Sequence, residues 1–62
     1  MKSIDNETNT ANYLDKPVKT LQQWRWRSEG PPYCKVGRSV KYRKADVDLW
    51  LEQNCVMPRH LS

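Results

Sequence analysis

The chain contains no phenylalanine, only two cysteines and two glycines, and a single histidine. A zinc site needs four cysteine or histidine ligands at close spacing, and Cys34, Cys55 and His60 do not supply them. We expect the two cysteines to be small apolar side chains rather than a disulfide. No apolar run approaches the ~18–20 residues that a membrane span requires. Residues 1–10 lack the apolar core of a secretory signal, so we expect a cytoplasmic protein with no membrane partner.

Catalytic motifs are also missing. With 62 residues there is room for one small domain and a modest core, but hardly for an enclosed substrate pocket. The sequence has no P-loop, no serine with a paired histidine and carboxylate, and no cluster of metal ligands. The carboxylates Asp46 and Asp48 fit better at the start of a helix. We therefore predict that the protein is not an enzyme and uses no cofactor and no metal.

Acidic residues are almost absent from the middle of the chain. Between Lys16 and Lys44 there are nine basic residues and one acid, Glu29, so this stretch carries +8. The remainder carries −4, which gives the net +4 of the whole chain. The total charge alone would suggest no more than a solvated surface. Its segregation predicts a polyanionic partner on one face.

Two helical patterns precede a Gly-Pro-Pro break. Asn6 is a plausible N-cap for a first helix that runs to Leu14 and buries Thr10, Ala11 and Leu14. Asp15-Lys16-Pro17 interrupts this pattern, and a proline suits the first turn of the next helix. The second helix, Val18–Arg27, places Val18, Leu21 and Trp24 on one side. Two short helices joined by such a turn form a helix-turn-helix.

Alternating residues after Pro32 predict a hairpin. Tyr33–Val36 and Val40–Arg43 flank the loop Gly37-Arg38-Ser39. The alternation predicts one apolar face, made by Cys34, Val36, Val40 and Tyr42, and one basic face. A last helix is expected to open at Ala45-Asp46 and to pack Val47, Trp50 and Leu51 against the core.

These patterns predict an α+β fold, a small winged helix-turn-helix with a closing helix. The domain is expected to span 6–54, between a flexible N-terminus at 1–5 and an irregular tail at 55–62. Trp24 and Trp50 are expected in the core. Trp26 could lie under Pro31-Pro32 or exposed at an interface, and the sequence leaves both open.

The exposed side of the second helix has long donors, two amides and no acid. Glutamine can pair with adenine, arginine or lysine with guanine, and threonine can touch a thymine methyl. The residues predicted to read bases are Lys19, Thr20, Gln22 and Gln23, with Arg38 and Ser39 in the hairpin loop entering the minor groove. The residues predicted to hold phosphates are Arg25, Arg27, Lys35 and Lys41. An ordinary hydrophilic surface is the alternative for both sets.

The run TLQQWRWRSEGPPYCKVGRSVKYRKADVDLWLEQ resembles the helix-turn-helix domain of small excisionases and AlpA-type phage regulators, which are relatives of the MerR DNA-binding domain. The resemblance covers about Asn6 to Gln53. Its most specific parts are GPPY-x-K-x-G at Gly30–Gly37, V-x-Y-R at Val40–Arg43 and D-V-x-x-W-L at Asp46–Leu51. Asp15 stands where the family commonly has glycine, and it tolerates the same left-handed backbone.

This resemblance implies a major-groove recognition helix, a minor-groove wing and a nucleoid-associated protein that binds double-stranded DNA. It implies two duties, which the motif does not separate. An excisionase, or recombination directionality factor, binds and bends the end of an integrated element, such as a prophage, and directs a tyrosine or serine integrase toward excision. An AlpA-type protein regulates transcription of mobile-element genes. We expect the former, with self-association in cooperative arrays; an interaction module that binds no DNA is the third possibility.

Overall fold

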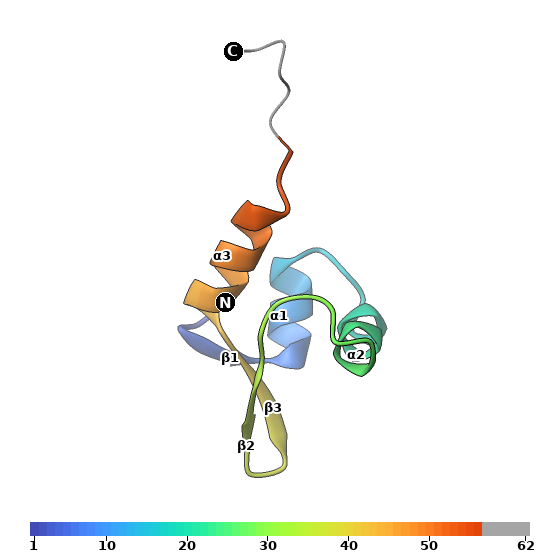
Figure 1. Cartoon of the computed structure of the whole chain (residues 1–62). Coiled ribbons are helices and arrows are strands. Elements are labelled where there is room, and N and C mark those ends of the chain that lie inside the picture. Colours follow the sequence, from blue (N-terminus) through green and yellow to red (C-terminus); the bar gives the residue numbers. More distant parts are fainter. Residues whose placement is uncertain (57–62) are drawn as a thin grey trace.

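Three helices and a three-stranded antiparallel sheet make up the part of the chain that the computed structural model describes, residues 1–56. In chain order the elements are β1 (Ile4–Asn6), α1 (Glu7–Tyr13), α2 (Val18–Trp26), β2 (Cys34–Val36), β3 (Ser39–Arg43) and α3 (Lys44–Gln53). The predicted winged helix-turn-helix is confirmed. Helices α1 and α2 form the helix-turn-helix, strands β2 and β3 project as the wing, and α3 lies beside α1, at the end of the molecule away from the wing tip (Figure 1).

The helix-turn-helix forms where the local signals place it. The side chain of Asn6 accepts a hydrogen bond from the Asn9 backbone N–H at 2.8 Å, so Asn6 is the N-cap of α1 as predicted. Asp15 in the turn adopts a φ of 55°, in the left-handed region that aspartate tolerates better than most residues. Pro17 is the N-cap of α2.

The N-terminus is not the loose end that the sequence predicted. Ile4–Asn6 forms β1, which pairs antiparallel with β3 in the order β1-β3-β2. Asp5, opposite Tyr42, is only 6% exposed, and its carboxylate accepts hydrogen bonds from the backbone N–H groups of Lys2 and Asn6. The bond from Lys2, then one from the Asn9 side-chain amide, and that from Asn6 lower the pKa of Asp5 to about 2. The short polar strand β1 is thus stabilised by its pairing with β3 and by the hydrogen bonds of the Asp5 carboxylate. Neither feature produces an apolar pattern in the sequence, which is why β1 was not predicted.

The core is small. Ala11, Leu21, Tyr42 and Val47 are fully buried, and Leu14, Val18, Trp24 and Val40 pack against them. The predicted core positions Val36 and Leu51 are wrong, because their side chains are 59% and 41% exposed.

The strand register explains the error at Val36. Val36 lies opposite Ser39 and Cys34 opposite Lys41, while Lys35 lies opposite Val40. Opposite residues share a face of the sheet, so Cys34 and Val36 are on the outer face and Lys35 is on the side of Val40 and Tyr42. The prediction of one apolar and one basic face is therefore wrong. Ser39 also belongs to β3 and not to the loop, which leaves a two-residue turn of Gly37 and Arg38.

The chain leaves α2 through two left-handed residues, Ser28 and Gly30, with φ of 56° and 79°. Gly30 lies against Trp24, and a Cβ there would be 2.8 Å from a carbon of the indole ring. Trp24 in turn meets Trp50 with ring centroids 5.3 Å apart, which joins α2 to α3.

Helix α3 begins at Lys44, one residue before the predicted start, and its N-cap Arg43 makes no capping hydrogen bond with its side chain. Asp46 instead pairs with Arg43 at 2.7 Å, and Asp48 pairs with Lys44 at 2.8 Å. Asp48 also accepts a hydrogen bond from the Tyr13 hydroxyl, which ties α3 to α1. Of the predicted irregular tail, Cys55 and Val56 lie in no helix or strand, and 57–62 lies outside the described residues.

Candidate nucleic-acid interface

The outward side of α2 carries most of the residues predicted to read DNA. Helix α2 turns Leu21 into the core and leaves the opposite side in solvent. Thr20 is half-buried at the edge of this side. The exposed residues of this side, here called the outer face of α2, are Lys19, Gln22, Gln23, Trp26 and, directly after the helix, Arg27.

Trp26 belongs to this outer face, which answers the question that the sequence left open. Its side chain is 89% exposed. Trp24, two residues earlier, has turned inward against Trp50 and Gly30.

Arg25 points inward rather than outward. Its Nε donates to Glu7 Oε2 at 2.7 Å, and a second nitrogen lies 3.4 Å from Oε1. The two side chains retain only 25% and 15% of their exposure. The hydrogen bond to Glu7 raises the pKa of Arg25, so the guanidinium is a permanent cation held inside the fold.

The same guanidinium reaches the base of the wing. It lies 5.7 Å from the ring centroid of Tyr33, and Tyr33 is 6.2 Å from the ring of Tyr42 on β3. Burial raises the pKa of Tyr42 to about 12, so it stays a neutral hydroxyl at any physiological pH. Glu7, Arg25, Tyr33 and Tyr42 thus join α1, α2 and the wing. The ion pair of Glu7 could not be predicted from the sequence, because its partner is 18 residues away.

The wing presents Arg38 at its tip. Gly37 has a φ of 62° at the first position of the two-residue turn, the place where such turns favour glycine. Arg38 is exposed beside it, and Ser39 follows as the exposed first residue of β3. Because of the register, Lys35 and Lys41 lie on opposite faces of the hairpin. A groove has a phosphate strand on each side, so a wing with one lysine on each face suits both.

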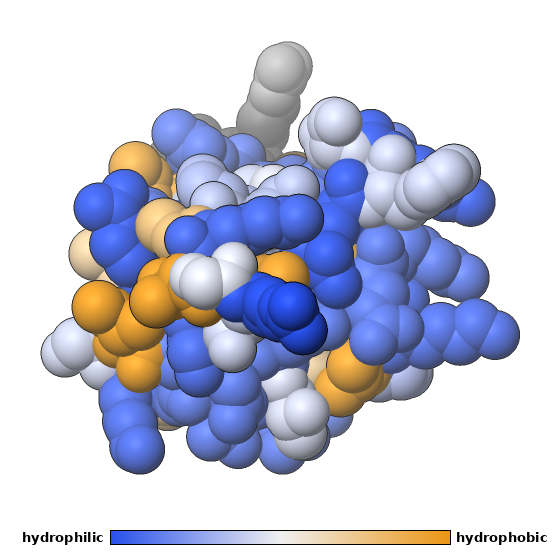
Figure 2. All heavy atoms as spheres, turned by 90° about the horizontal axis from the view of Figure 1, so that it is seen from below, coloured by the Kyte–Doolittle hydropathy of each residue, from blue (hydrophilic) through white to orange (hydrophobic). Residues whose placement is uncertain are grey.

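Intramolecular ion pairs divide the basic stretch in two. Of its nine cations, Arg25, Arg43 and Lys44 pair with carboxylates of the fold. The other six form no ion pair within residues 1–56 and are here called the unpaired cations; they are Lys16, Lys19, Arg27, Lys35, Arg38 and Lys41. The surface seen from the wing tip is correspondingly hydrophilic, with apolar patches mainly away from the side of α2 (Figure 2).

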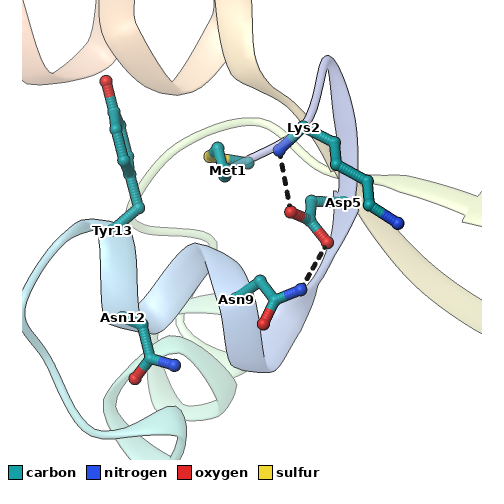
Figure 3. Close-up of a pocket in the computed structure, with 6 residues that line it drawn as sticks. All are labelled: Met1, Lys2, Asp5, Asn9, Asn12 and Tyr13. Carbon is teal, nitrogen blue, oxygen red and sulfur yellow. Dashed lines mark hydrogen bonds between the residues drawn. The ribbon is translucent and has the colours of Figure 1, made fainter.

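A hollow on another side of the molecule has a structural explanation. It has a volume of about 550 Å³ and lies between the N-terminal segment and α1, lined by Met1, Lys2, Asp5, Asn9, Asn12 and Tyr13 (Figure 3). The carboxylate of Asp5 is its one anionic group, and it is occupied by Lys2, Asn6 and the Asn9 amide. The polar groups here hold β1 to α1.

The described residues form neither a metal site nor a membrane-spanning helix. Within residues 1–56, no three His, Cys, Asp or Glu side chains gather as metal ligands, and both cysteines are free thiols. None of the helices in that part of the chain has the length and apolarity needed to cross a membrane.

A helix-turn-helix with an exposed polar helix face, a basic wing and unpaired cations on both defines a small DNA-binding protein. A family model described as a helix-turn-helix domain matches residues 8–55. The chain belongs to this family, that of small DNA-binding proteins of the excisionase and AlpA type. No curated protein matches the sequence.

Proposed function

We propose that the protein is an excisionase, a recombination directionality factor that binds specific duplex sites at the end of an integrated element. The observation that carries the proposal is the distribution of the six unpaired cations over the turn, α2 and the wing. Ion pairs inside the fold use up the remaining cations of the basic stretch. The surface that is left has the charge and the two-part shape required to follow a DNA duplex.

The outer face of α2 supplies base recognition in this proposal. Gln22 and Gln23 offer paired donors and acceptors of the kind that adenine matches in the major groove. Lys19 and Thr20 lie one turn closer to the helix N-terminus, the end that enters the groove.

The wing supplies a second contact. Arg38, with Ser39 beside it, enters the minor groove, where a narrow A·T-rich stretch attracts an arginine. Lys35 and Lys41 contact phosphates on either side, and Arg27 does so at the end of α2. Arg25 is committed to Glu7, so we assign it the task of holding α2 against the wing instead of phosphate contact.

The small size of the domain argues for neighbours on the DNA. Six cations release few counterions, and a single domain with so few contacts binds one site weakly. We therefore propose cooperative arrays on repeated sites. An array bends the DNA and presents it to an integrase, tyrosine or serine type, that carries out excision.

The decisive experiment maps the binding sites of a tagged chain in source cells by chromatin immunoprecipitation. After induction, PCR across the rejoined chromosome measures excision, and transcript levels are measured beside each site. Sites at the two ends of an integrated element and an increase in the rejoined product support the proposal. The matched control is a double variant, Gln23→Ala with Arg38→Ala, which should abolish both signals while leaving the fold intact.

Other outcomes refute it in different ways. Sites at promoters, with altered transcripts and no rejoined product, identify an AlpA-type regulator. A chain that precipitates no specific DNA, and that shifts neither random nor element-end duplexes on a gel, is an interaction module of another kind.

A further inference from the structure

Trp26 is the one aromatic side chain of α2 that serves no purpose in the fold. It is 89% exposed, whereas Trp24 and Trp50 lie against each other with ring centroids 5.3 Å apart. A single exposed apolar residue needs no explanation by itself. The position of Trp26 on the helix, however, requires an explanation.

Trp26 lies in the middle of the outer face of α2. At 3.6 residues per turn, seven residues bring it to within about 20° of Lys19 around the helix axis, and four bring it to within about 40° of Gln22. Gln23 lies about 60° to its other side by the same geometry. Leu21, buried against the core, is on the opposite side. Whatever surface Lys19, Gln22 and Gln23 meet, the indole of Trp26 meets as well.

The ring also reaches toward the start of the helix. Side chains on an α-helix lean toward its N-terminus, so a residue covers the turn that precedes it. An indole on the last residue of α2 thereby covers the level of Gln22 and Gln23. It is not left beyond the end of the recognition surface.

An apolar ring on this face has one apolar counterpart in the major groove. The base edges there present hydrogen-bond donors and acceptors, and only thymine adds a methyl group at C5. Polar side chains on α2 can form hydrogen bonds with the amino groups, ring nitrogens and carbonyls of the bases, but they gain little binding energy from contact with that methyl group. A tryptophan surrounded by glutamines adds the missing type of contact.

We infer that Trp26 is a specificity residue that packs its indole on the C5-methyl of a thymine in the bound site. The inference rests on the proposed use of α2 as the recognition helix. It adds a determinant that neither the family match nor the polar pattern of α2 assigns. The preference it creates is for thymine over cytosine at one position, next to the bases read by Gln22 and Gln23.

The test removes the methyl group without changing the protein. Duplexes bound by the wild-type chain are first selected from a random pool, and each thymine of the selected site is then replaced singly by deoxyuridine. Base pairing is retained and only the C5-methyl is lost. Affinity should fall about three- to fivefold at one position, the effect of one methyl group removed from an apolar contact, and remain unchanged elsewhere.

A protein variant completes the cycle. Trp26→Ala should bind the thymine duplex at least about tenfold more weakly, as truncation of a buried aromatic contact does, and should no longer distinguish thymine from uracil at the sensitive position. Trp26→Leu keeps an apolar side chain and should retain part of that distinction. Circular dichroism and thermal midpoints should match the wild type, because the side chain makes no core contact.

Each contrary result has a distinct meaning. If Trp26→Ala loses the same factor on both duplexes, the ring packs on sugar and phosphate, and the methyl contact is refuted. If the variant keeps its affinity for one site but loses cooperativity on two, Trp26 contacts a neighbouring protein, and the inference is again overturned. If wild type binds the selected site but no uracil substitution matters, the inference alone fails. If selection enriches no duplex, the proposed DNA function fails with it.

Discussion

The two sides of α2 use the same types of residue for opposite purposes. Each side has a tryptophan and an arginine: Trp24 and Arg25 face inward, while Trp26 and Arg27 face outward. Trp24 packs against Trp50 and Arg25 binds Glu7, so the inner pair holds three helices and the wing together. The outer pair makes no ion pair or ring contact within residues 1–56. Composition alone therefore says little about role here; the position around the helix axis decides it.

The largest difference in stability is expected between alanine variants of Leu21 and Gln22, which are adjacent in the sequence. Leu21→Ala removes a fully buried side chain, and such cavities cost about 2–5 kcal/mol. A domain this small has little stability to lose, so much of this variant should be unfolded at 37 °C. Gln22→Ala should change the free energy of unfolding by less than about 0.5 kcal/mol. Urea denaturation of both variants measures the contrast, and equal losses would contradict the assignment of the two sides.

The two arginines give the next comparison. Arg25→Ala leaves the carboxylate of Glu7 half-buried without its partner, which should destabilise the fold by about 1–3 kcal/mol. Arg27→Ala should leave stability unchanged and weaken DNA binding instead. It should also reduce the slope of log K against log salt by about 1.

A second variant separates the possible roles of Arg25. Glu7→Gln keeps the size of the side chain and removes its charge. If Arg25 positions the wing, Glu7→Gln should weaken DNA binding even though Glu7 is an acid and its loss makes the protein more basic. Improved binding would show that Arg25, once released from Glu7, contacts phosphate and that its ion pair with Glu7 is not needed to position the wing.

The sequence predicts those parts of this fold that depend on local signals. Asn6 as a cap, the turn at Asp15 and the hairpin turn at Gly37 are each specified by residues close to where they act. The core residues Leu21, Tyr42 and Val47 follow from apolar spacing.

Features that depend on residues far apart in the chain could not be predicted from the sequence. Period-two alternation shows which residues of one strand share a face. It does not show which face of β2 lies beside which face of β3, and the apolar alternation therefore wrongly predicts that Val36 is buried. Strand β1 has a charged residue and an amide in three positions and exists because β3 is there to pair with it. For the candidate site, the sequence predicts which side of α2 and which turn of the hairpin are exposed, but it does not distinguish Arg25 from Arg27, because the contact to Glu7 is distant in sequence.

The third comparison sets residues that read bases against residues that hold phosphate. Gln22→Ala or Gln23→Ala should change which sequences are preferred, by about 1–3 kcal/mol for the affected base. Lys41→Ala should weaken binding to all sequences alike. Selection from random duplexes with each variant measures preference, and titration at several salt concentrations measures the phosphate contribution. If all three variants lose the same factor on every sequence, α2 does not read bases.

The smallest effect on stability is expected at Asp5, a buried carboxylate that binds groups of the fold itself. Its pKa is lowered from 3.8 to about 2 by the N–H groups of Lys2 and Asn6 and by the Asn9 amide. A carboxylate whose pKa is lower in the folded state stabilises the fold fully above pH ~4 and loses this contribution as the pH falls toward 2. Asp5→Asn removes the charge that these donors bind, so the variant should be less stable than wild type at neutral pH. The two unfolding curves should converge between pH 4 and pH 2 as Asp5 takes up its proton in the wild type. Since Asp5 lies beside β3 on the side opposite β2, DNA binding by the folded fraction should stay unchanged. A parallel loss of stability at every pH would show that the second acceptor oxygen of Asp5 matters and its charge does not.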